Sequence, residues 1–179
     1  MTATSDQPSA RTQRTLISVD AMGGDQGPAI VVAGCSASAL KNPDISFILH
    51  GPAEALEPLV AKRPELKGRC TIRDAQGVVT MDDKPSNVVR NGKGTSMWSA
   101  IESVRDNEAS VAVSCGNTGA LMALSMLRLR KLPGVNRPAI AILWPSRNPQ
   151  GFNVMLDVGA DVRADAEDLL QYALMGTSY

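Results

Sequence analysis

The sequence has few aromatic residues, one histidine and no excess of charge of either sign. Phe, Trp and Tyr make up 3% of its 179 residues, and eighteen basic residues balance eighteen acidic ones. Proteins that bind nucleic acids usually present a basic surface, often with aromatic rings on which bases stack. The balanced charge and the scarcity of rings therefore argue against a nucleic-acid partner.

Long apolar segments are also missing. No run approaches the length of about 18 residues that a membrane-spanning helix needs. The first 14 residues, MTATSDQPSARTQR, lack the apolar stretch of a signal peptide and show no periodicity. We therefore expect a cytoplasmic protein with a disordered tail over residues 1–14 and a folded part over residues 15–179.

Cysteine is scarce and scattered. Cys35, Cys70 and Cys115 form an odd set without a C-x-x-C pair, which argues against a disulfide framework and a structural zinc site. We expect reduced thiols, and the sequence predicts neither a metal nor a cofactor. Cys115 is either a nucleophile activated by a helix N-terminus or a small residue that fills space. The one histidine, His50, is either a base or a strand-end residue with satisfied hydrogen bonds.

Short apolar runs typical of strands alternate with stretches of helical periodicity from residue 15 onward. The expected strands cover 16–20, 45–50, 70–74, 110–114, 139–143 and 152–158, and the expected helices cover 28–41, 53–62, 95–106 and 118–130. Nearly apolar strands that alternate with helices are typical of a parallel sheet covered on both faces. We therefore predict an α/β protein with three layers and a mainly parallel sheet.

One more helix is expected over DAEDLLQYALMGTSY, residues 165–179, with Asp165 as its cap. Its apolar positions Leu169, Leu170 and Leu174 have no following element to pack against. From this pattern we expect the chain to be truncated, and to be inactive and poorly stable by itself.

A glycine-rich stretch, DAMGGDQGP, follows the first expected strand at residues 20–28. In open parallel sheets, ligands bind beyond the carboxyl ends of the strands. Gly23 and Gly24 allow the backbone to approach a ligand closely, and Asp20 and Asp25 supply carboxylates that could orient one. The alternative is a tight turn capped by Asp25.

A second stretch of this kind, SCGNTGA at residues 114–120, opens a helix. The free amides and the dipole of a helix N-terminus attract anions, so a phosphate or an oxyanion would fit near Gly116 and Gly119. Asn117 and Thr118 add side-chain donors. The alternative is an ordinary helix cap by Asn117 or Thr118.

The segment DDKPSNVVRNGKG, residues 82–94, carries Lys84, Arg90 and Lys93. It is either a solvated run of charges or a positive rim that draws in an anionic substrate. Nucleotide binding finds no support, because there is no G-x-G-x-x-G and a Walker A loop would need a glycine where Asn87 stands.

Five motifs in a fixed order resemble one known family. DAMGGD, SCGNTGA, RPAIA, LDVGAD and QYALMG, within residues 16–179, are similar to motifs of the PlsX family, the bacterial phosphate acyltransferases of phospholipid synthesis. The resemblance implies a fold similar to phosphotransacetylases and isopropylmalate dehydrogenases. It also implies transfer of a fatty acyl group from acyl carrier protein to inorganic phosphate, which yields acyl phosphate, by homodimers that act at the inner membrane surface.

Carried onto this sequence, the resemblance gives a set of candidate site residues. Phosphate would bind at Gly23, Gly24, Asp25, Gly116, Asn117, Thr118 and Gly119. Asn117 and Asp20 are assigned catalytic roles, and Lys84, Arg90 and Arg137 are assigned to substrate binding. Neither a metal nor a cofactor is implied.

Two departures from the family leave alternatives open. Members most often carry alanine where Cys115 stands, which argues against a nucleophilic thiol. Members are also longer than this chain, so a non-catalytic half-domain that binds acyl carrier protein or its own partner chain is one alternative. A phosphotransacylase that uses coenzyme A is another, because the same fold would allow it.

Overall fold

The computed structural model describes residues 15–158 and 164–178. The expected tail over 1–14 and the end of the LDVGAD motif lie outside the described residues. The chain divides into two compact units, Met1–Arg128 and Leu129–Tyr179, and each is described by itself.

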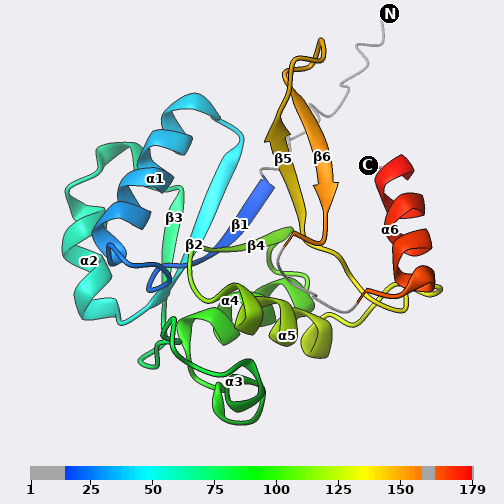
Figure 1. Ribbon diagram of the computed structural model, residues 1–179. Helices are drawn as coiled ribbons and strands as arrows, with labels where there is room; N and C mark the ends of the chain where they lie inside the picture. Colours follow the sequence, from blue (N-terminus) through cyan, green and yellow to red (C-terminus); the bar gives the residue numbers. More distant parts are fainter. Residues whose placement is uncertain (1–14, 159–163, 179) are drawn as a thin grey trace, which may run out of the picture. The chain divides into compact units, whose positions relative to one another are not determined.

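The first unit is built on a parallel sheet. Its strands are β1 (Thr15–Asp20), β2 (Ile45–Gly51), β3 (Cys70–Asp74) and β4 (Val111–Ser114), in the order β3-β2-β1-β4. All neighbouring pairs are parallel, so the carboxyl ends of the four strands meet at one edge. The predicted α/β fold with a mainly parallel sheet is thereby confirmed (Figure 1).

Helices cover the sheet from two sides. The first layer contains α1 (Pro28–Lys41), α2 (Ala53–Ala61) and the 3-10 turn η1 (Pro64–Leu66), and the second contains α3 (Pro85–Asn91), α4 (Ser96–Arg105) and α5 (Thr118–Arg128). Proline at the first position of α1 suits a helix start, because its missing N–H would have no partner there. The predicted bounds of α1 and β3 match the structure, whereas α3 was not predicted.

Alternating side chains of the strands supply two different interfaces. Val19, Phe47 and Leu49 point to the α1 side and form an apolar core with Val32 and Leu56. A second apolar cluster lies among α3, α4 and α5 and consists of Val79, Val88, Met97, Trp98, Ile101, Ala120 and Leu124. On the other side of β1 and β2, Ser18 and His50 bond to Ala100 and Ser99 of α4, so both faces of these strands are covered, as is usual for parallel strands.

The interface between β1, β2 and α4 contains a buried polar group of side chains around His50, which is completely buried. Its Nε2 lies 2.8 Å from Ser18 Oγ and its Nδ1 lies 2.8 Å from Ser99 Oγ. Ser18 donates its hydroxyl proton to the carbonyl of Ala100, so it accepts from Nε2–H, and Ser99 then donates to Nδ1. Both ring nitrogens are thus satisfied, which favours the structural reading of His50.

The second unit contains β5 (Ala141–Pro145), β6 (Phe152–Leu156) and α6 (Ala166–Ser178). The two strands pair with each other, antiparallel, in a sheet of their own. Residues 146–151 join them, and a connection this short allows a hairpin but no crossover to a parallel partner. Asp165 caps α6 as predicted, since its Oδ1 accepts from the amides of Glu167 and Asp168 at 2.9 Å. None of the helices in the described ranges has the length and apolar character to cross a bilayer.

Candidate active site

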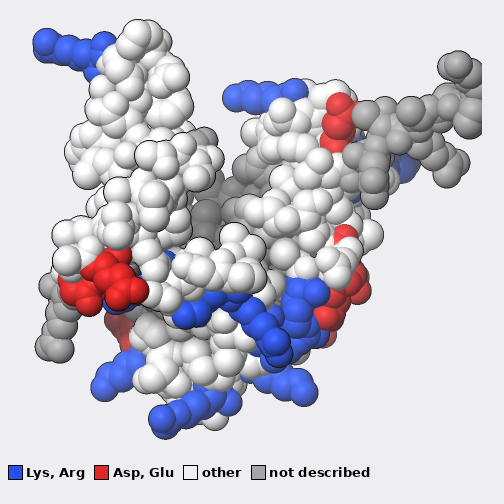
Figure 2. Space-filling view, turned by 90° about the vertical axis from the view of Figure 1, so that its right-hand side faces the viewer, with Lys and Arg blue, Asp and Glu red and all other residues white. Residues whose placement is uncertain are grey.

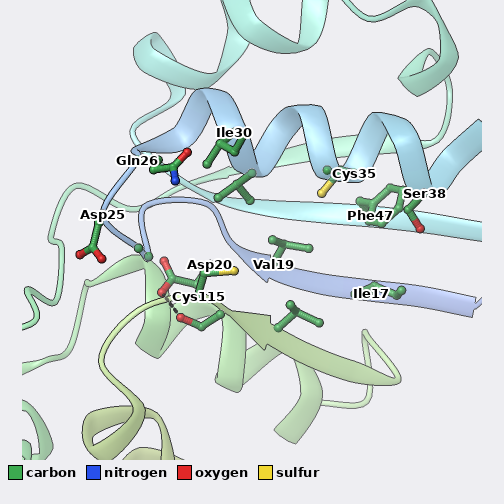
Figure 3. Close-up of a pocket in the computed structure, with 16 residues that line it drawn as sticks. Ile17, Val19, Asp20, Asp25, Gln26, Ile30, Cys35, Ser38, Phe47 and Cys115 are labelled. Carbon is green, nitrogen blue, oxygen red and sulfur yellow. Dashed lines mark hydrogen bonds between the residues drawn. The ribbon is translucent and has the colours of Figure 1, made fainter. Parts of the chain in front are cut away.

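The two glycine-rich loops, DAMGGD and SCGNTGA, meet where β1 and β4 end. Asp20 and Ser114 are paired across the two strands, and the Ser114 hydroxyl donates to Asp20 Oδ2 at 2.7 Å (Figure 3). The other carboxylate oxygen of Asp20 accepts from the amide of Met22 at 3.2 Å. The amide of Gly116 donates to Ser114 Oγ at 3.0 Å. Asp20 is 2% exposed, so a nearly buried carboxylate connects both glycine-rich loops.

Glycine is required where these loops touch. A Cβ on Gly23 would lie 2.8 Å from Asp20 Oδ2, from Ser114 Oγ and from the amide nitrogen of Gly116. Gly24 has a φ of +100°, which L side chains rarely adopt, and its Cβ would lie 3.2 Å from Cys115. The structure therefore brings DAMGGD and SCGNTGA, which are far apart in the sequence, into direct backbone contact.

Asn117 caps α5 and also binds a neighbouring loop. Its Oδ1 accepts from the amide of Ala120 at 3.0 Å. Its Nδ2 donates to the carbonyls of Thr80, Met81 and Asp83 at 3.1, 3.1 and 2.9 Å. The side chain is 8% exposed, and both its oxygen and its nitrogen are engaged. Asn117 thus holds the segment before α3 against the start of α5.

The first turn of α5 retains donors for a ligand. Thr118 and Gly119 are its first two residues, and the amides at these positions have no partner inside the helix. Thr118 is exposed. A Cβ on Gly119 would lie 3.0 Å from Pro85 Cγ, the first residue of α3. The end of α5 that carries these amides thus lies directly beside the start of α3.

A pocket of about 510 Å³ opens beside these loops. Asp20, Gly23 to Gln26, Ser114 and Cys115 form its polar end (Figure 3). From there it follows α1 over the sheet, where it is lined by Ile17, Val19, Ile30, Val31, Phe47 and Val113. The site therefore joins a polar mouth to an apolar groove. Asp25 lies at the mouth and is exposed.

The basic residues assigned to substrate binding are spread over different elements. Lys84 directly precedes α3 and follows the loop that Asn117 binds, whereas Arg90 lies in the last turn of α3. Both are exposed. Figure 2 shows Lys and Arg side chains gathered in the lower half of the view. Since this view is turned about the vertical axis, α3 to α5 of Figure 1 lie at the same level. Arg137 belongs to the second unit, so the structure does not test whether it joins the site.

Ser114 is the site residue that sequence reasoning missed. Its hydroxyl serves Asp20 and Gly116 at once, yet in the sequence it stands only as the first letter of SCGNTGA. The available signal was its place as the last residue of an expected strand, 110–114. Among residues 15–158 and 164–178, no group of three or more His, Cys, Asp or Glu could hold a metal ion.

Comparison with known proteins places the chain in a family. It is 80% identical over 179 residues to the phosphate acyltransferase of Ruegeria sp. (strain TM1040), covering all of this chain and 48% of that protein. It is 73% identical over 179 residues to the phosphate acyltransferase of Roseobacter denitrificans, covering 50% of it, and 78% identical over 164 residues to that of Paracoccus denitrificans, covering 44%. The chain spans about half the length of the curated relatives that it matches. A family model described as "Fatty acid synthesis protein" matches residues 15–179, and the chain therefore belongs to this family, the PlsX family that its motifs resemble.

Proposed function

We propose that the full-length form of this protein transfers a fatty acyl group from acyl carrier protein to inorganic phosphate and so forms acyl phosphate. Direct packing of the Gly23 loop on the Gly116 loop, at the carboxyl edge of the sheet, is the observation that carries the proposal. The family and the names of its curated members support an acyl transfer to phosphate. That acyl carrier protein supplies the acyl group, and that acyl phosphate is the product, are parts of the proposal.

The proposed reaction needs hydrogen-bond donors for phosphate and for an oxyanion, and the carboxyl edge of the sheet is suited to provide them. A phosphate oxygen attacks the thioester carbonyl, a C–O bond forms, and the C–S bond then breaks. The proton that hydrogen phosphate loses ends on the departing thiolate, so the atoms balance without a metal or a redox step. Backbone amides that stabilise the tetrahedral oxyanion lower the barrier, typically by about 3 to 4 kcal/mol for one well-aimed donor.

The residues divide into binding and positioning groups. We assign phosphate to the amides of Gly24 and Asp25 and to those of Thr118 and Gly119, because helix N-termini and glycine loops present such donors to anions. Asp20, Ser114 and Asn117 position these amides through the hydrogen bonds that join the loops.

The exposed Lys84 and Arg90 are suited to attract an anionic substrate before it binds. In this proposal acyl carrier protein is the partner that delivers the acyl group. Arg137, pairing of two copies and contact with the inner membrane surface remain predictions from the sequence.

The experiment uses a joined chain, in which residues 1–179 replace the matched part of the Ruegeria sp. relative. Acyl phosphate is measured from a long-chain acyl carrier protein thioester and phosphate, and separately from acetyl coenzyme A and phosphate. We expect turnover with the first pair. Turnover with acetyl coenzyme A alone would contradict the proposal and favour the phosphotransacylase.

Site variants of the joined chain test the positioning role. Asp20→Asn keeps the shape but weakens the charge-assisted hydrogen bond from Ser114, so we expect kcat to fall at least tenfold. Asp44→Asn is the matched control, because Asp44 is exposed before the amino end of β2, at the opposite edge of the sheet. Equal kcat values for both variants would remove Asp20 from the site.

A further inference from the structure

The surface of α3 carries positive charges that are not paired with carboxylates. Lys84 directly precedes this helix, Arg90 lies in its last turn, and Lys93 follows it. All three side chains are exposed. Across residues 15–158 and 164–178, none of the three takes part in a salt bridge. We call these three residues the α3 patch.

The carboxylates of the same helical layer are already paired with other residues. Oε1 of Glu102, in α4, lies 2.9 Å from Nη1 of Arg105 and 2.6 Å from Nη2 of Arg128. Oδ1 of Asp106 lies 2.7 Å from Nε of Arg105. Oε2 of Glu108 lies 2.5 Å from a guanidinium nitrogen of an arginine in β3. These acidic side chains are thus engaged away from the α3 patch.

Charge is distributed differently on the two sides of the sheet. Residues 28–67, which form α1, β2, α2 and η1, contain four basic and four acidic side chains. Residues 84–128, which form α3, α4, β4 and α5, contain five basic and three acidic side chains. All three of these acids form the salt bridges described above. Positive charge is therefore in excess on the side of α3.

The α3 patch begins beside the amides that we assign to phosphate. A Cβ on Gly119 would lie 3.0 Å from Cγ of Pro85, the residue after Lys84. Asn117 binds the loop before α3 through the carbonyls of three residues. A helix of seven residues is about 10 Å long, so the α3 patch extends away from the phosphate site along the whole helix. A partner that covers the patch and also reaches these amides must be larger than a phosphate ion.

We propose that the α3 patch is the docking site of an acidic protein, whose carboxylates pair with Arg90 and Lys93 while the group that it carries reaches the phosphate site. The inference rests on the proposed function, in which this protein is the acyl carrier protein, and it requires that the carrier presents acidic side chains. Met81, in the loop before α3, is 54% exposed and adds an apolar contact of the kind that protein interfaces favour. Opposite charges across an interface speed association and fix the orientation of the partner.

An anionic membrane fits the α3 patch less well. Asp82 and Asp83 lie in the same segment, so residues 82–94 carry two negative and three positive charges. A lipid surface presents its charge evenly and would meet the carboxylates as well as the cations. A protein can place its own carboxylates opposite Arg90 and Lys93 and leave Asp82 in solvent.

Carrier binding tests the α3 patch. In the joined chain, the double variant Arg90→Glu, Lys93→Glu reverses two charges of the patch. The double variant Lys41→Glu, Lys62→Glu is the matched control, because it changes the net charge equally at exposed residues that end α1 and α2. The dissociation constant of acyl carrier protein without an acyl group is measured by fluorescence anisotropy at about 0.15 M salt, where charges more than about 8 Å apart are largely screened. We expect it to rise at least tenfold in the patch variant and less than threefold in the control.

Hydrogen exchange gives a second measurement that needs no variant. We expect addition of the unacylated carrier to slow exchange at the amides of residues 85–93 of the joined chain at least threefold. The amides of residues 53–61, which form α2 on the opposite side of the sheet, should exchange at the same rate with and without the carrier. This comparison locates the docking site even if the patch variant fails to fold.

Several results would overturn the proposal. Equal dissociation constants for the two double variants, or unchanged exchange at residues 85–93, would show that the carrier binds elsewhere. Failure of the carrier to bind the unaltered joined chain would remove the docking site altogether. If the patch variant lost binding to phosphatidylglycerol vesicles but kept its affinity for the carrier, the α3 patch would be a membrane contact instead.

These measurements do not depend on acyl transfer, so the docking site and the proposed function fail separately. A carrier that binds at the α3 patch without formation of acyl phosphate would contradict only the proposed function. Acyl phosphate formation by a chain whose affinity for the carrier is insensitive to the patch variant would contradict only the docking site.

Discussion

Gly23 lies where the two glycine-rich loops touch, so its substitution should disturb both of them. In Gly23→Ala the new methyl group would meet Asp20, Ser114 and Gly116 at 2.8 Å, and overpacking of this kind typically costs about 1 to 3 kcal/mol. We expect the midpoint of thermal unfolding of the 1–179 chain to fall. Gly34→Ala is the control, because its methyl group meets nothing within 4 Å and alanine favours a helix interior. If the two variants were equally stable, the loops would not be packed as described.

Asn117 combines a helix cap with a contact between loops, so its loss should affect stability as well as turnover. Removal of a cap costs about 1 kcal/mol, and loss of the Nδ2 donors releases the carbonyls of Thr80, Met81 and Asp83. We expect Asn117→Ala to lower the free energy of unfolding by about 2 kcal/mol. Asn87→Ala is the matched control, since the Asn87 side chain is exposed and, among the described residues, its one hydrogen bond is accepted from Asn91.

In the joined chain, we expect Asn117→Ala to reduce acyl phosphate formation strongly, because the amides of Thr118 and Gly119 depend on this cap for their position. Acyl phosphate formation at the unaltered rate, in a variant that remains folded, would remove Asn117 from the site. Cys115→Ala should stay active, since the proposed reaction needs no thiol there.

At the scale of elements, the sequence predicted those helices and strands that have a clear hydrophobic periodicity and begin or end at characteristic residues. The helix over 28–41 begins at proline, and its bounds agree with α1. The seven residues of α3 were missed, because Lys84, Arg90 and Lys93 dominate a segment too short to show a clear helical period. Strands were expected at 139–143 and 152–158, and the structure has them at Ala141–Pro145 and Phe152–Leu156. Their separate antiparallel sheet depends on the short connection between them.

The contact of β2 with α4 leads to a prediction about pH. Burial, with a contribution from Arg73, lowers the pKa of His50 from 6.5 to about 4. The unfolded chain therefore binds a proton at His50 between these values while the folded chain does not. Neutral His50 therefore contributes about 3 kcal/mol to the free energy of unfolding above pH 6.5. This contribution is lost progressively as the pH falls from 6.5 toward 4.

The measurement is simple because His50 is the one histidine of the chain. We expect its proton NMR signals in the folded 1–179 chain to remain those of neutral imidazole from pH 7 to pH 5. In parallel, the free energy of unfolding should decrease over this range, and His50→Gln should show a flatter profile. Carboxylates such as Asp83 and Glu108 add little between pH 7 and pH 5. Hydrogen bonds lower their pKa in the folded chain, and carboxyl groups of the unfolded chain titrate at about pH 4. Titration of His50 near pH 6.5 would show that it is not buried as described.

At the scale of the whole molecule, the site was predictable in its parts but not in its contacts. The two glycine-rich loops were expected at one edge, because the carboxyl ends of parallel strands share it. That Gly23 touches Gly116, or that Ser114 binds Asp20, depends on β1 and β4 being neighbours in the order β3-β2-β1-β4. This order follows from packing of the whole sheet and leaves no local signal.

The second unit is the part of the chain with the least packing of its own. Its sheet has two strands, and Leu143 and Trp144 of β5 are each 54% exposed. Three leucines of α6, Leu169, Leu170 and Leu174, are 60%, 61% and 59% exposed. A two-stranded sheet is marginally stable without a well-packed cover, and local opening follows the number of buried apolar contacts.

We therefore expect the amides of β5 and β6 in the 1–179 chain to exchange at least tenfold faster than those of β1 and β2, which lie in the apolar core. Hydrogen exchange monitored by mass spectrometry measures both regions in one experiment. In the joined chain the difference should shrink, because additional polypeptide can cover the leucines of α6. A uniform exchange rate across both units of the 1–179 chain would mean that they open together, and that Leu129–Tyr179 draws its stability from the first unit.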